Sequence, residues 1–175
     1  MENTYPSFET ERLFLRPTAE ADAPMILALL NTPKWHLYIG DRNVNTLEDA
    51  VLYIQKKMRP QLERLGYSNY TLIRKVDQVK VGSCGLYDRE GLEGIDIGFA
   101  LLPDFEKKGY AFEAANCLKE AAFTVFGITA LRGITVKENL SSQKLLSKLG
   151  LVHTEDINLP NDEEELMLFE LKPKQ

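Results

Sequence analysis

The sequence predicts a mixed α/β (α+β) protein in which helices cover both faces of one twisted, mostly antiparallel sheet of about seven strands. Two observations carry this prediction. Strand-like runs and segments of helical periodicity follow one another in the order β, α, α, three β, α, β, α, β, β. The three consecutive strands are separated only by short turns, which favours antiparallel pairing, whereas the later strand–helix alternation favours a parallel pair.

The first half of the chain is expected to form one strand and two helices before the three-strand run. The segment "RLFLRP" (12–17) predicts a strand that ends at its proline. Asp22 is a candidate N-cap for the next helix, and a loop rich in bulky side chains should follow that helix. Thr46 and Asp49 resemble a capping box at the start of a long helix, which Pro60 should kink near its end.

Turn and capping residues mark the elements of the second half. Asp77-Gln78 predicts a hairpin turn, and a short helix is expected to begin at Asn139 and end at Gly150. The acidic loop 161–165 predicts a closing hairpin. The strands and helices expected in this half are 69–76, 79–87, 94–102, 110–126, 131–136, 139–150, 151–157 and 165–171.

Composition and charge restrict the possible functions. The chain has 175 residues, of which 44% are hydrophobic and 27% charged, so we expect one globular domain over residues 1–175. A net charge of −5 argues against binding nucleic acid through many phosphates, and mildly favours a cationic partner such as an amine. No apolar run approaches the ~20 residues of a membrane span. The polar N-terminus does not resemble a targeting signal, so we expect a cytoplasmic protein without membrane association.

The cysteines and histidines argue against a metal site. Cys84 and Cys117 lack the spacing of metal ligands and lie in apolar segments typical of buried free thiols, which fits a reducing cytoplasm. His36 and His153 are too few and too far apart in the sequence to supply a histidine-based site. We therefore expect no metal.

Lys107, Lys108 and Gly109 directly precede a predicted helix, although the partial positive charge of a helix N-terminus disfavours each cation there by about 0.3–1 kcal/mol. Lysines become favourable at this position once an anion binds, because free backbone N–H groups point outward and glycine lets a ligand approach closely. The segment predicts either an anion site or a solvated lysine pair whose charge Glu106 partly neutralises. It matches neither the P-loop nor the dinucleotide-binding glycine pattern.

Four segments together resemble the GNAT superfamily of acetyl-coenzyme A-dependent N-acetyltransferases, and within it the ribosomal-protein-alanine N-terminal acetyltransferase subfamily. The family patterns are T-E-R-L-x-L-R-P, E-I-G-Y-x-L-x-P-x-Y, G-K-G-Y-A-x-E-A and N-x-x-S-x-x-x-L-x-K-x-G-F. The matching segments, in the same order, are FETERLFLRP (8–17), IDIGFALLPDF (95–105), KKGYAFEAA (107–115) and NLSSQKLLSKLGL (139–151). The resemblance spans nearly the whole chain and implies a GNAT-like fold, with one N-acetyltransferase domain over residues 1–175.

Several positions depart from the family pattern. Glu106 stands where Gln or Arg is usual, Lys107 replaces the first glycine of the loop, and Asp96 replaces the more usual Glu. Many relatives use a tyrosine that follows the last helix on the cofactor side as general acid, but no tyrosine follows Tyr110 here. These departures keep open the alternative that the chain is a non-catalytic acyl-coenzyme A binding module.

The resemblance implies acetyl-coenzyme A as cosubstrate and no metal. The coenzyme's diphosphate is expected on the loop and the first helical N–H groups, its pantetheine arm along a strand from which the neighbouring strand splays away, and its sulfur beside the short helix that follows. The implied cofactor-binding residues are Lys107, Lys108, Gly109, Tyr110 and Ala111 for the diphosphate, Phe99, Ala100, Leu101 and Leu102 for the arm, and Asn139 and Ser142 for the amide arm and the sulfur.

The implied reaction is direct attack of a neutral primary amine on the thioester. Asp96 is the candidate base, acting through water because its side chain is short, or else a carboxylate that only pairs with a basic residue. A backbone N–H near Leu101 is the candidate donor to the thioester oxygen. The general-acid role belongs to Ser142, to water or to no group.

Trp35, Tyr38 and Tyr87 are the candidate residues of the acceptor pocket, with core packing as the alternative for each. The acceptor amine is expected on a protein N-terminus or on a small molecule. The resemblance does not choose between these acceptors, or between a monomer and a homodimer.

Overall fold

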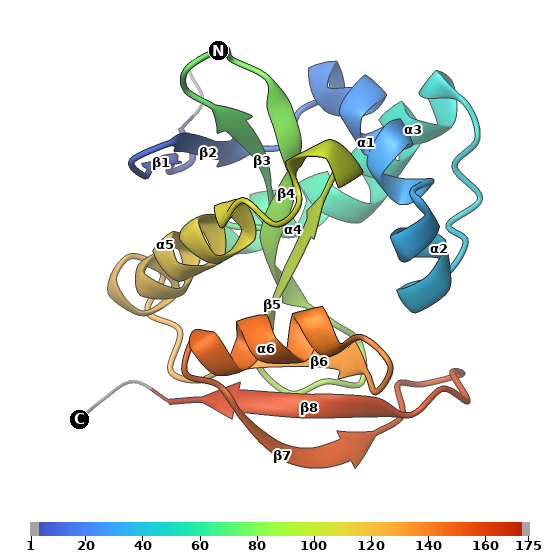
Figure 1. Ribbon diagram of the computed structural model, residues 1–175, viewed down its shortest axis with the longest axis vertical. Helices are drawn as coiled ribbons and strands as arrows, with labels where there is room; N and C mark the ends of the chain where they lie inside the picture. Colours follow the sequence, from blue (N-terminus) through green and yellow to red (C-terminus); the bar gives the residue numbers. More distant parts are fainter. Residues whose placement is uncertain (1–3, 173–175) are drawn as a thin grey trace.

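The computed structural model describes residues 4–172, and its eight strands form one sheet in the order β1-β2-β3-β4-β5-β6-β8-β7 (Figure 1). Every neighbouring pair is antiparallel except β5 and β6, which are parallel. The predicted mixed, mostly antiparallel sheet is confirmed, and the two-residue β1 adds one strand to the seven expected. The strands are β1 (Phe8–Glu9), β2 (Leu13–Pro17), β3 (Asn69–Arg74), β4 (Lys80–Asp88), β5 (Ile95–Leu101), β6 (Leu131–Val136), β7 (Val152–Ile157) and β8 (Leu166–Leu171).

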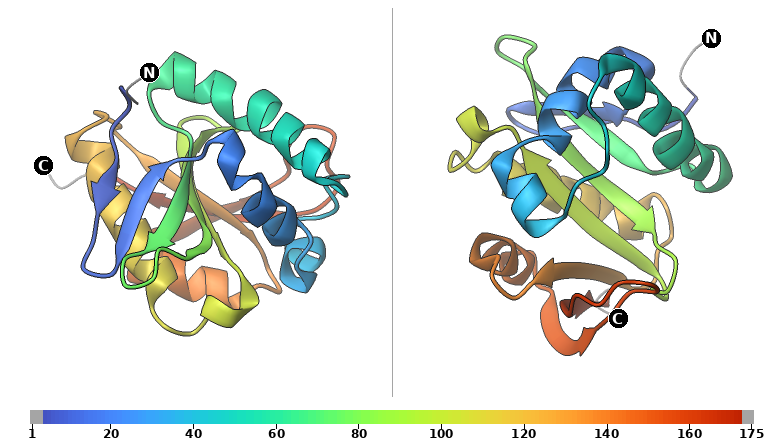
Figure 2. Two further views of the ribbon diagram at one scale, coloured as in Figure 1. Left: turned by 90° about the horizontal axis from the view of Figure 1, so that it is seen from above. Right: turned by 90° about the vertical axis from the view of Figure 1, so that its right-hand side faces the viewer.

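Helices cover both faces of the sheet, as predicted (Figures 1 and 2). One face carries α1 (Ala23–Leu30), α2 (Pro33–Tyr38), α3 (Leu47–Tyr53), the π-helical segment η2 (Ile54–Met58) and α4 (Arg59–Leu65). The other face carries α5 (Tyr110–Thr124) and α6 (Leu140–Lys148). Short 3-10 turns, η1 (Glu20–Asp22) and η3 (Pro103–Phe105), precede α1 and follow β5. Between residues 4 and 172, no helix has both the length and the apolar character needed to cross a membrane.

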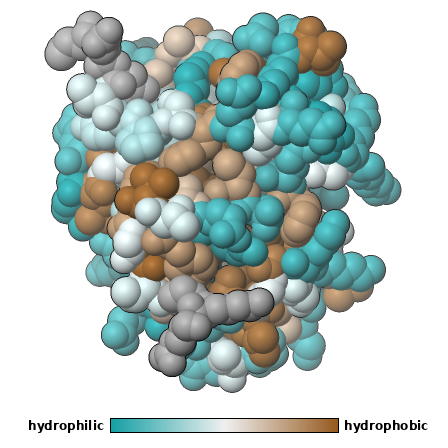
Figure 3. Space-filling model, turned by 90° about the vertical axis from the view of Figure 1, so that its left-hand side faces the viewer, coloured by the Kyte–Doolittle hydropathy of each residue, from teal (hydrophilic) through white to brown (hydrophobic). Residues whose placement is uncertain are grey.

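Two apolar clusters hold the helices to the sheet. The larger joins β2–β6 and β8 to α5 and α6, with Leu118 and Leu146 among its fully buried members. The smaller joins α1, α3 and the start of η2 around Ile26 and Ile54. On the side that carries β1 and the C-terminal end of α5, the surface shows hydrophobic residues interspersed with polar ones (Figure 3).

Local signals explain most element boundaries. Thr46 and Asp49 form the predicted capping box, with each side chain accepting from the other residue's backbone N–H. Gly150 has φ +98° after α6, and the N–H of Leu151 donates to Leu146 O, which closes the helix as expected. The kink expected at Pro60 takes the form of η2, since proline has no N–H to continue the ordinary helical ladder.

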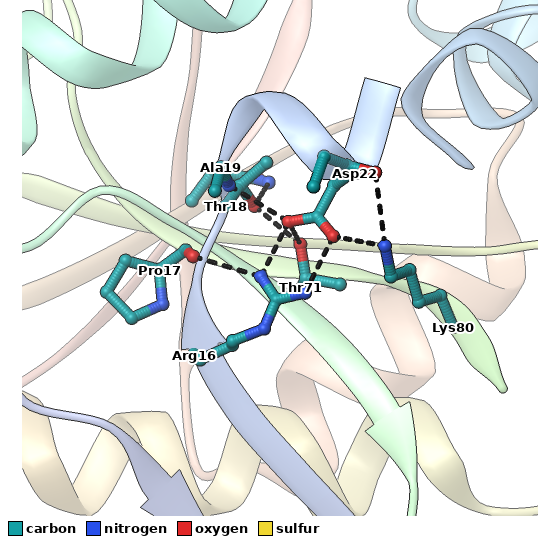
Figure 4. Close-up of polar contacts among 9 residues, drawn as sticks. Arg16, Pro17, Thr18, Ala19, Asp22, Thr71 and Lys80 are labelled. Carbon is teal, nitrogen blue, oxygen red and sulfur yellow. Dashed lines mark hydrogen bonds and ion pairs between the residues drawn. The ribbon is translucent and has the colours of Figure 1, made fainter. Parts of the chain in front are cut away.

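Two expectations about the N-terminal half are wrong. The segment expected as a loop contains α2, which Thr32 caps by accepting from Trp35 N, with Pro33 in its first turn. Asp22 precedes α1, but its side chain makes no capping bond to that helix. The carboxylate instead accepts from the backbone N–H of Ala19 and from a buried polar cluster that involves β2, β3 and β4 (Figure 4).

Candidate active site

The centre of the sheet opens between β5 and β6. These strands pair only at Ile95↔Leu131 and Asp96↔Arg132, so the remainder of β5 has a free edge on that side. The N–H of Leu102 donates to Val81 O at 2.9 Å on the β4 side. Because N–H groups alternate between the two edges of an antiparallel strand, the N–H groups of Leu101 and Phe99 point to the open edge. The fold therefore leaves backbone groups free along the strand where the pantetheine arm was expected.

The open edge leads, through η3, to the start of α5. Gly109 is the N-cap of this helix at φ +85°, and no side chain caps the helix. The N–H groups of Gly109, Tyr110 and Ala111 find no acceptor among the described residues. Lys107 and Lys108 are both exposed beside them. Free N–H groups, the helix dipole and two cations together favour an anion at this point.

Glu106 does not face the loop's N–H groups. Its carboxylate pairs with Lys34 Nζ of α2 at 2.9 Å. This ion pair turns the acidic group toward α2, so the departure from the family's usual Gln or Arg leaves the loop open to an anion. The pair is largely solvent-accessible, with Lys34 55% exposed, so its contribution to stability is expected to be small.

Lys107 adopts φ +60°, the left-handed region in which a residue with a Cβ is strained by about 1–2 kcal/mol. Replacing Lys107 by glycine should therefore stabilise the protein by about 0.5–1 kcal/mol, after allowance for the greater freedom of glycine in the unfolded chain. Urea unfolding measures this change. Lys108→Gly is the matched control, since Lys108 does not have a positive φ and its replacement should be neutral or destabilising. Equal effects of the two substitutions would contradict the explanation.

Sequence reasoning missed the residue that braces this loop, Arg12 of the "TERL" segment. Its Nε lies 2.8 Å from Glu113 Oε1 of α5, and its Nη1 donates to the carbonyl of Lys108 at 2.9 Å. Its guanidinium lies 4.3 Å from the centroid of the Tyr110 ring. Thr10 Oγ1 donates to the other oxygen of Glu113 at 2.7 Å. The turn between β1 and β2 thus holds the loop and the first turn of α5 in place.

Asp96 lies where β5 and β6 separate, and it is 1% exposed. Arg89 Nε lies 3.0 Å from each of its carboxylate oxygens. Burial raises the pKa of Asp96 above its ordinary value, and the charge of Arg89 opposes that rise. A buried carboxylate held beside one arginine suits a base that accepts a proton through water.

Tyr87 lies opposite Asp96 in the β4–β5 pairing. Its ring covers Gly85 and Gly98, where an added Cβ would lie 2.3 Å and 2.8 Å from ring atoms. Burial raises the pKa of Tyr87, so its hydroxyl stays protonated, and that hydroxyl donates to Asn69 Oδ1. The structure therefore brings this predicted acceptor residue beside the predicted base.

The other predicted acceptor residues lie on α2. Trp35 packs against the same apolar cluster as Ala100 and Leu102 of the β5 end, and its buried Nε1 has no hydrogen-bond partner among residues 4–172. Tyr38 is partly buried at the end of α2, and no described contact joins it to Asp96. Only Tyr87 of the three candidates is thus held directly at the base.

Asn139 caps α6, as expected for the residue at which this helix begins. Its Oδ1 accepts from Ser142 N at 3.2 Å, which leaves its amide nitrogen without a partner in the described part of the chain. The helix follows β6, on the far side of the opening from β5.

Within residues 4–172, no group of three or more His, Cys, Asp or Glu side chains gathers in a way that could hold a metal ion.

Comparison with known proteins agrees with this geometry. The family model of the acetyltransferase (GNAT) domain matches residues 12–152. An uncharacterized N-acetyltransferase of Bacillus subtilis, YoaA, is 25% identical over 147 residues, which cover 83% of this chain and 82% of the relative. The solved acetyltransferase of Agrobacterium tumefaciens has a TM-score of 0.81 at 20% identity, with 99% of this chain and 98% of that chain covered.

A second solved structure is that of a ribosomal-protein-S5-alanine acetyltransferase from Vibrio fischeri. It has a TM-score of 0.77 at 19% identity and covers 95% of this chain and 96% of its own. At 19–20% identity the two solved structures support only the fold. Membership of the family rests on the family model, which matches most of the sequence. The chain is therefore an acetyltransferase that belongs to the GNAT family.

Proposed function

We propose that this acetyltransferase transfers the acetyl group of acetyl-coenzyme A directly to a primary amine, on a protein N-terminus or a small molecule. The observation that carries the proposal is continuity: the free edge of β5 leads into the uncapped N-terminus of α5. A ligand that combines an amide-rich arm with a diphosphate needs these two features in this order. The proposal places all of residues 1–175 in one domain.

The residues present fit the coenzyme. Gly109 has no side chain beyond its backbone and holds φ +85°, so the backbone can approach a phosphate closely. The N–H groups of Lys108 through Ala111 would hold the diphosphate, with charge from Lys107. Phe99–Leu102 would pair with the arm, and Asn139 and Ser142 would lie beside its end. When bound, the coenzyme supplies an activated acetyl thioester.

The chain's own residues then have separate roles. Asp96 would accept the amine's proton through water, since it is buried at the end of the opening, where the charge of Arg89 favours its ionised form. The N–H of Leu101 would donate to the oxygen on which negative charge develops. Ser142 or water would return a proton to the leaving sulfur. Tyr87 would form the floor of the acceptor site, with Trp35 and Tyr38 of α2 nearer its rim.

A protein N-terminus is among the proposed acceptors because one structural neighbour is a ribosomal-protein-S5-alanine acetyltransferase. The reaction is proposed to take place in the cytoplasm, where the two free cysteines, Cys84 and Cys117, would stay reduced.

Release of coenzyme A thiol tests the function directly. The purified chain is mixed with acetyl-coenzyme A and a panel of small amines and of peptides that copy ribosomal-protein N-termini. We expect thiol release that requires an acceptor and yields an acetylated amine by mass spectrometry. Tight binding of acetyl-coenzyme A with no transfer to any acceptor would instead make the chain an acyl-coenzyme A binding module.

A further inference from the structure

Arg89 has more hydrogen-bond donors than the described residues use. Only its Nε contacts Asp96, at 3.0 Å from both oxygens, and its two terminal Nη groups have no partner within residues 4–172. Its guanidinium lies 5.0 Å from the centroid of the Tyr87 ring, and its side chain is 37% exposed. The arginine is therefore held by a carboxylate and an aromatic face, while the described residues leave its fork of terminal N–H donors unpaired.

Arg16 in the same chain shows what a purely structural arginine looks like. Its Nη1 and Nη2 lie 2.7 Å and 2.8 Å from the two oxygens of Asp22, so the whole fork is used on one internal carboxylate (Figure 4). Arg89 could have paired with Asp96 in the same manner. Its use of Nε alone leaves the part of the guanidinium that best matches a carboxylate free for a ligand.

The carboxylate that holds Arg89 points to the face of the sheet on which α2, with the predicted acceptor residues Trp35 and Tyr38, also lies. Ile97 belongs to the α5 side of the sheet, so the alternation of side chains places Asp96 on the face of α1 and α3. Arg132, opposite Asp96 in the β5–β6 pairing, also uses only its Nε on a carboxylate, Glu170 at 3.0 Å, but it is 18% exposed and its Nη1 lies against Gly94. Arg89 is thus the more exposed of the two arginines beside the predicted base, at 37% against 18%.

Asp96 and Arg89 together present one anion and one cation to the acceptor side. An amine with a carboxylate close to it presents the opposite charges, with the amine toward Asp96 and the carboxylate toward the Nη fork. Resting on the proposed function, we infer that Arg89 selects acceptors that carry a carboxylate beside the reacting amine. The carboxylate belongs either to a small amino acid or to an acidic residue that follows the N-terminal residue of a peptide.

Matched acceptor pairs test this inference. Each pair has the same length and differs only in carboxylate against amide: ω-amino acids against their amides, and peptides beginning Ala-Glu against Ala-Gln. Rates are compared at equal concentrations of the neutral amine. The variants are Arg89→Met, Arg89→Lys, which keeps a cation beside Asp96 but lacks the fork, and the control Arg64→Met. Arg64 pairs at the surface with Asp88, the residue that precedes Arg89. Its replacement therefore removes a positive charge from the same region but leaves the Arg89–Asp96 contact in place.

We expect the unmodified protein to favour the carboxylate member by about tenfold or more in kcat/KM, in the peptide arm or the small-molecule arm. Both Arg89 variants should bring that ratio close to one, mainly through KM for the carboxylate member, while Arg64→Met keeps it. If Arg89 only held the fold, its replacement would lower kcat/KM for both acceptors of a pair by the same factor. Arg89→Lys keeps the test decisive if Arg89→Met does not fold.

The inference and the proposed function fail in different ways. If the protein acetylates both members of every pair equally well, or prefers the amides, the inference is overturned and the proposed function stands. An unchanged ratio in Arg89→Lys would overturn the inference as well. If calorimetry detects no binding of acetyl-coenzyme A, and no acceptor is acetylated, both are overturned.

Discussion

Replacing Asp96 by asparagine should lower kcat/KM for the acceptor by about a hundredfold or more at neutral pH, since a positioned general base typically contributes 10²–10⁴-fold. Asparagine keeps the size of the buried side chain and an oxygen for Arg89 Nε, but it cannot accept a proton. The Kd of acetyl-coenzyme A should stay unchanged, because Asp96 lies away from the loop that precedes α5. Steady-state kinetics and calorimetry measure the two quantities.

The pH profile separates a base from a structural carboxylate. A base acts only when it is ionised, so kcat/KM of the unmodified protein should rise with pH through the Asp96 pKa, which burial raises above its ordinary value. Asp96→Asn should remove that rise. Glu170→Gln is the control, since Glu170 also pairs with an arginine on the same face of the sheet. A nearly unchanged kcat/KM in Asp96→Asn would show that the acceptor amine loses its proton without help from this carboxylate.

Replacing Asp22 by asparagine should cause a large loss of stability, about 2–4 kcal/mol. Asp22 is fully buried, and its carboxylate pairs with Arg16 and Lys80 at 2.7 Å each and accepts from Thr71 Oγ1 at 2.9 Å (Figure 4). Asparagine keeps the volume but removes the charge that holds both cations. A loss of about 1 kcal/mol lowers the thermal unfolding midpoint of a domain of this size by about 2–4 °C. The midpoint of Asp22→Asn should therefore be roughly 5–15 °C lower than that of the unmodified protein.

Acid unfolding gives an independent check on Asp22. Burial alone would raise the pKa of this carboxyl, but Arg16, the Ala19 N–H, Lys80 and Thr71 outweigh burial and hold the pKa well below its usual range. The ionised form therefore stabilises the protein above the unfolded-state pKa of about 3.9, and this stabilisation is lost as the pH falls through the lower folded-state value. Stability should consequently fall more steeply below pH ~4 in the unmodified protein than in Asp22→Asn. Parallel curves would contradict this role.

Much of the fold follows from local sequence signals. The Thr46–Asp49 capping box, the Asp77-Gln78 turn and the Asn139 and Gly150 ends of α6 all act within a few residues, so the sequence alone predicts them. The element order then limits the sheet to a mixed, mostly antiparallel one. Asp22 was misjudged because its partners come from β2, β3 and β4, and a long-range cluster outweighed the local capping preference.

The candidate site likewise has features that the sequence predicts and features that only the fold reveals. Of its backbone features, the glycine before α5 was predictable from a short motif, and the free edge of β5 was implied by the family resemblance. Arg12 and Arg89 were missed because their roles depend on partners that only the fold brings near. Arg12 reaches a carboxylate 101 residues away in the sequence, and Arg89 meets Asp96 across the turn between β4 and β5. In a single sequence Arg89 does not differ from a surface arginine, and the TERL motif marks Arg12 without showing its partner.

Calorimetric titration with acetyl-coenzyme A tests the central claim most directly. The protein should bind one equivalent with a Kd on the order of micromolar, near the lower end of typical enzyme KM values. Combined replacement of Lys107 and Lys108 by alanine and of Gly109 by valine should weaken binding at least tenfold, or about 1.4 kcal/mol. Lys56→Ala with Lys57→Ala, an exposed lysine pair on η2, should leave it unchanged. No heat with acetyl-coenzyme A, or equal affinity in the loop variant and the unmodified protein, would contradict the assignment of the loop as the coenzyme's diphosphate site.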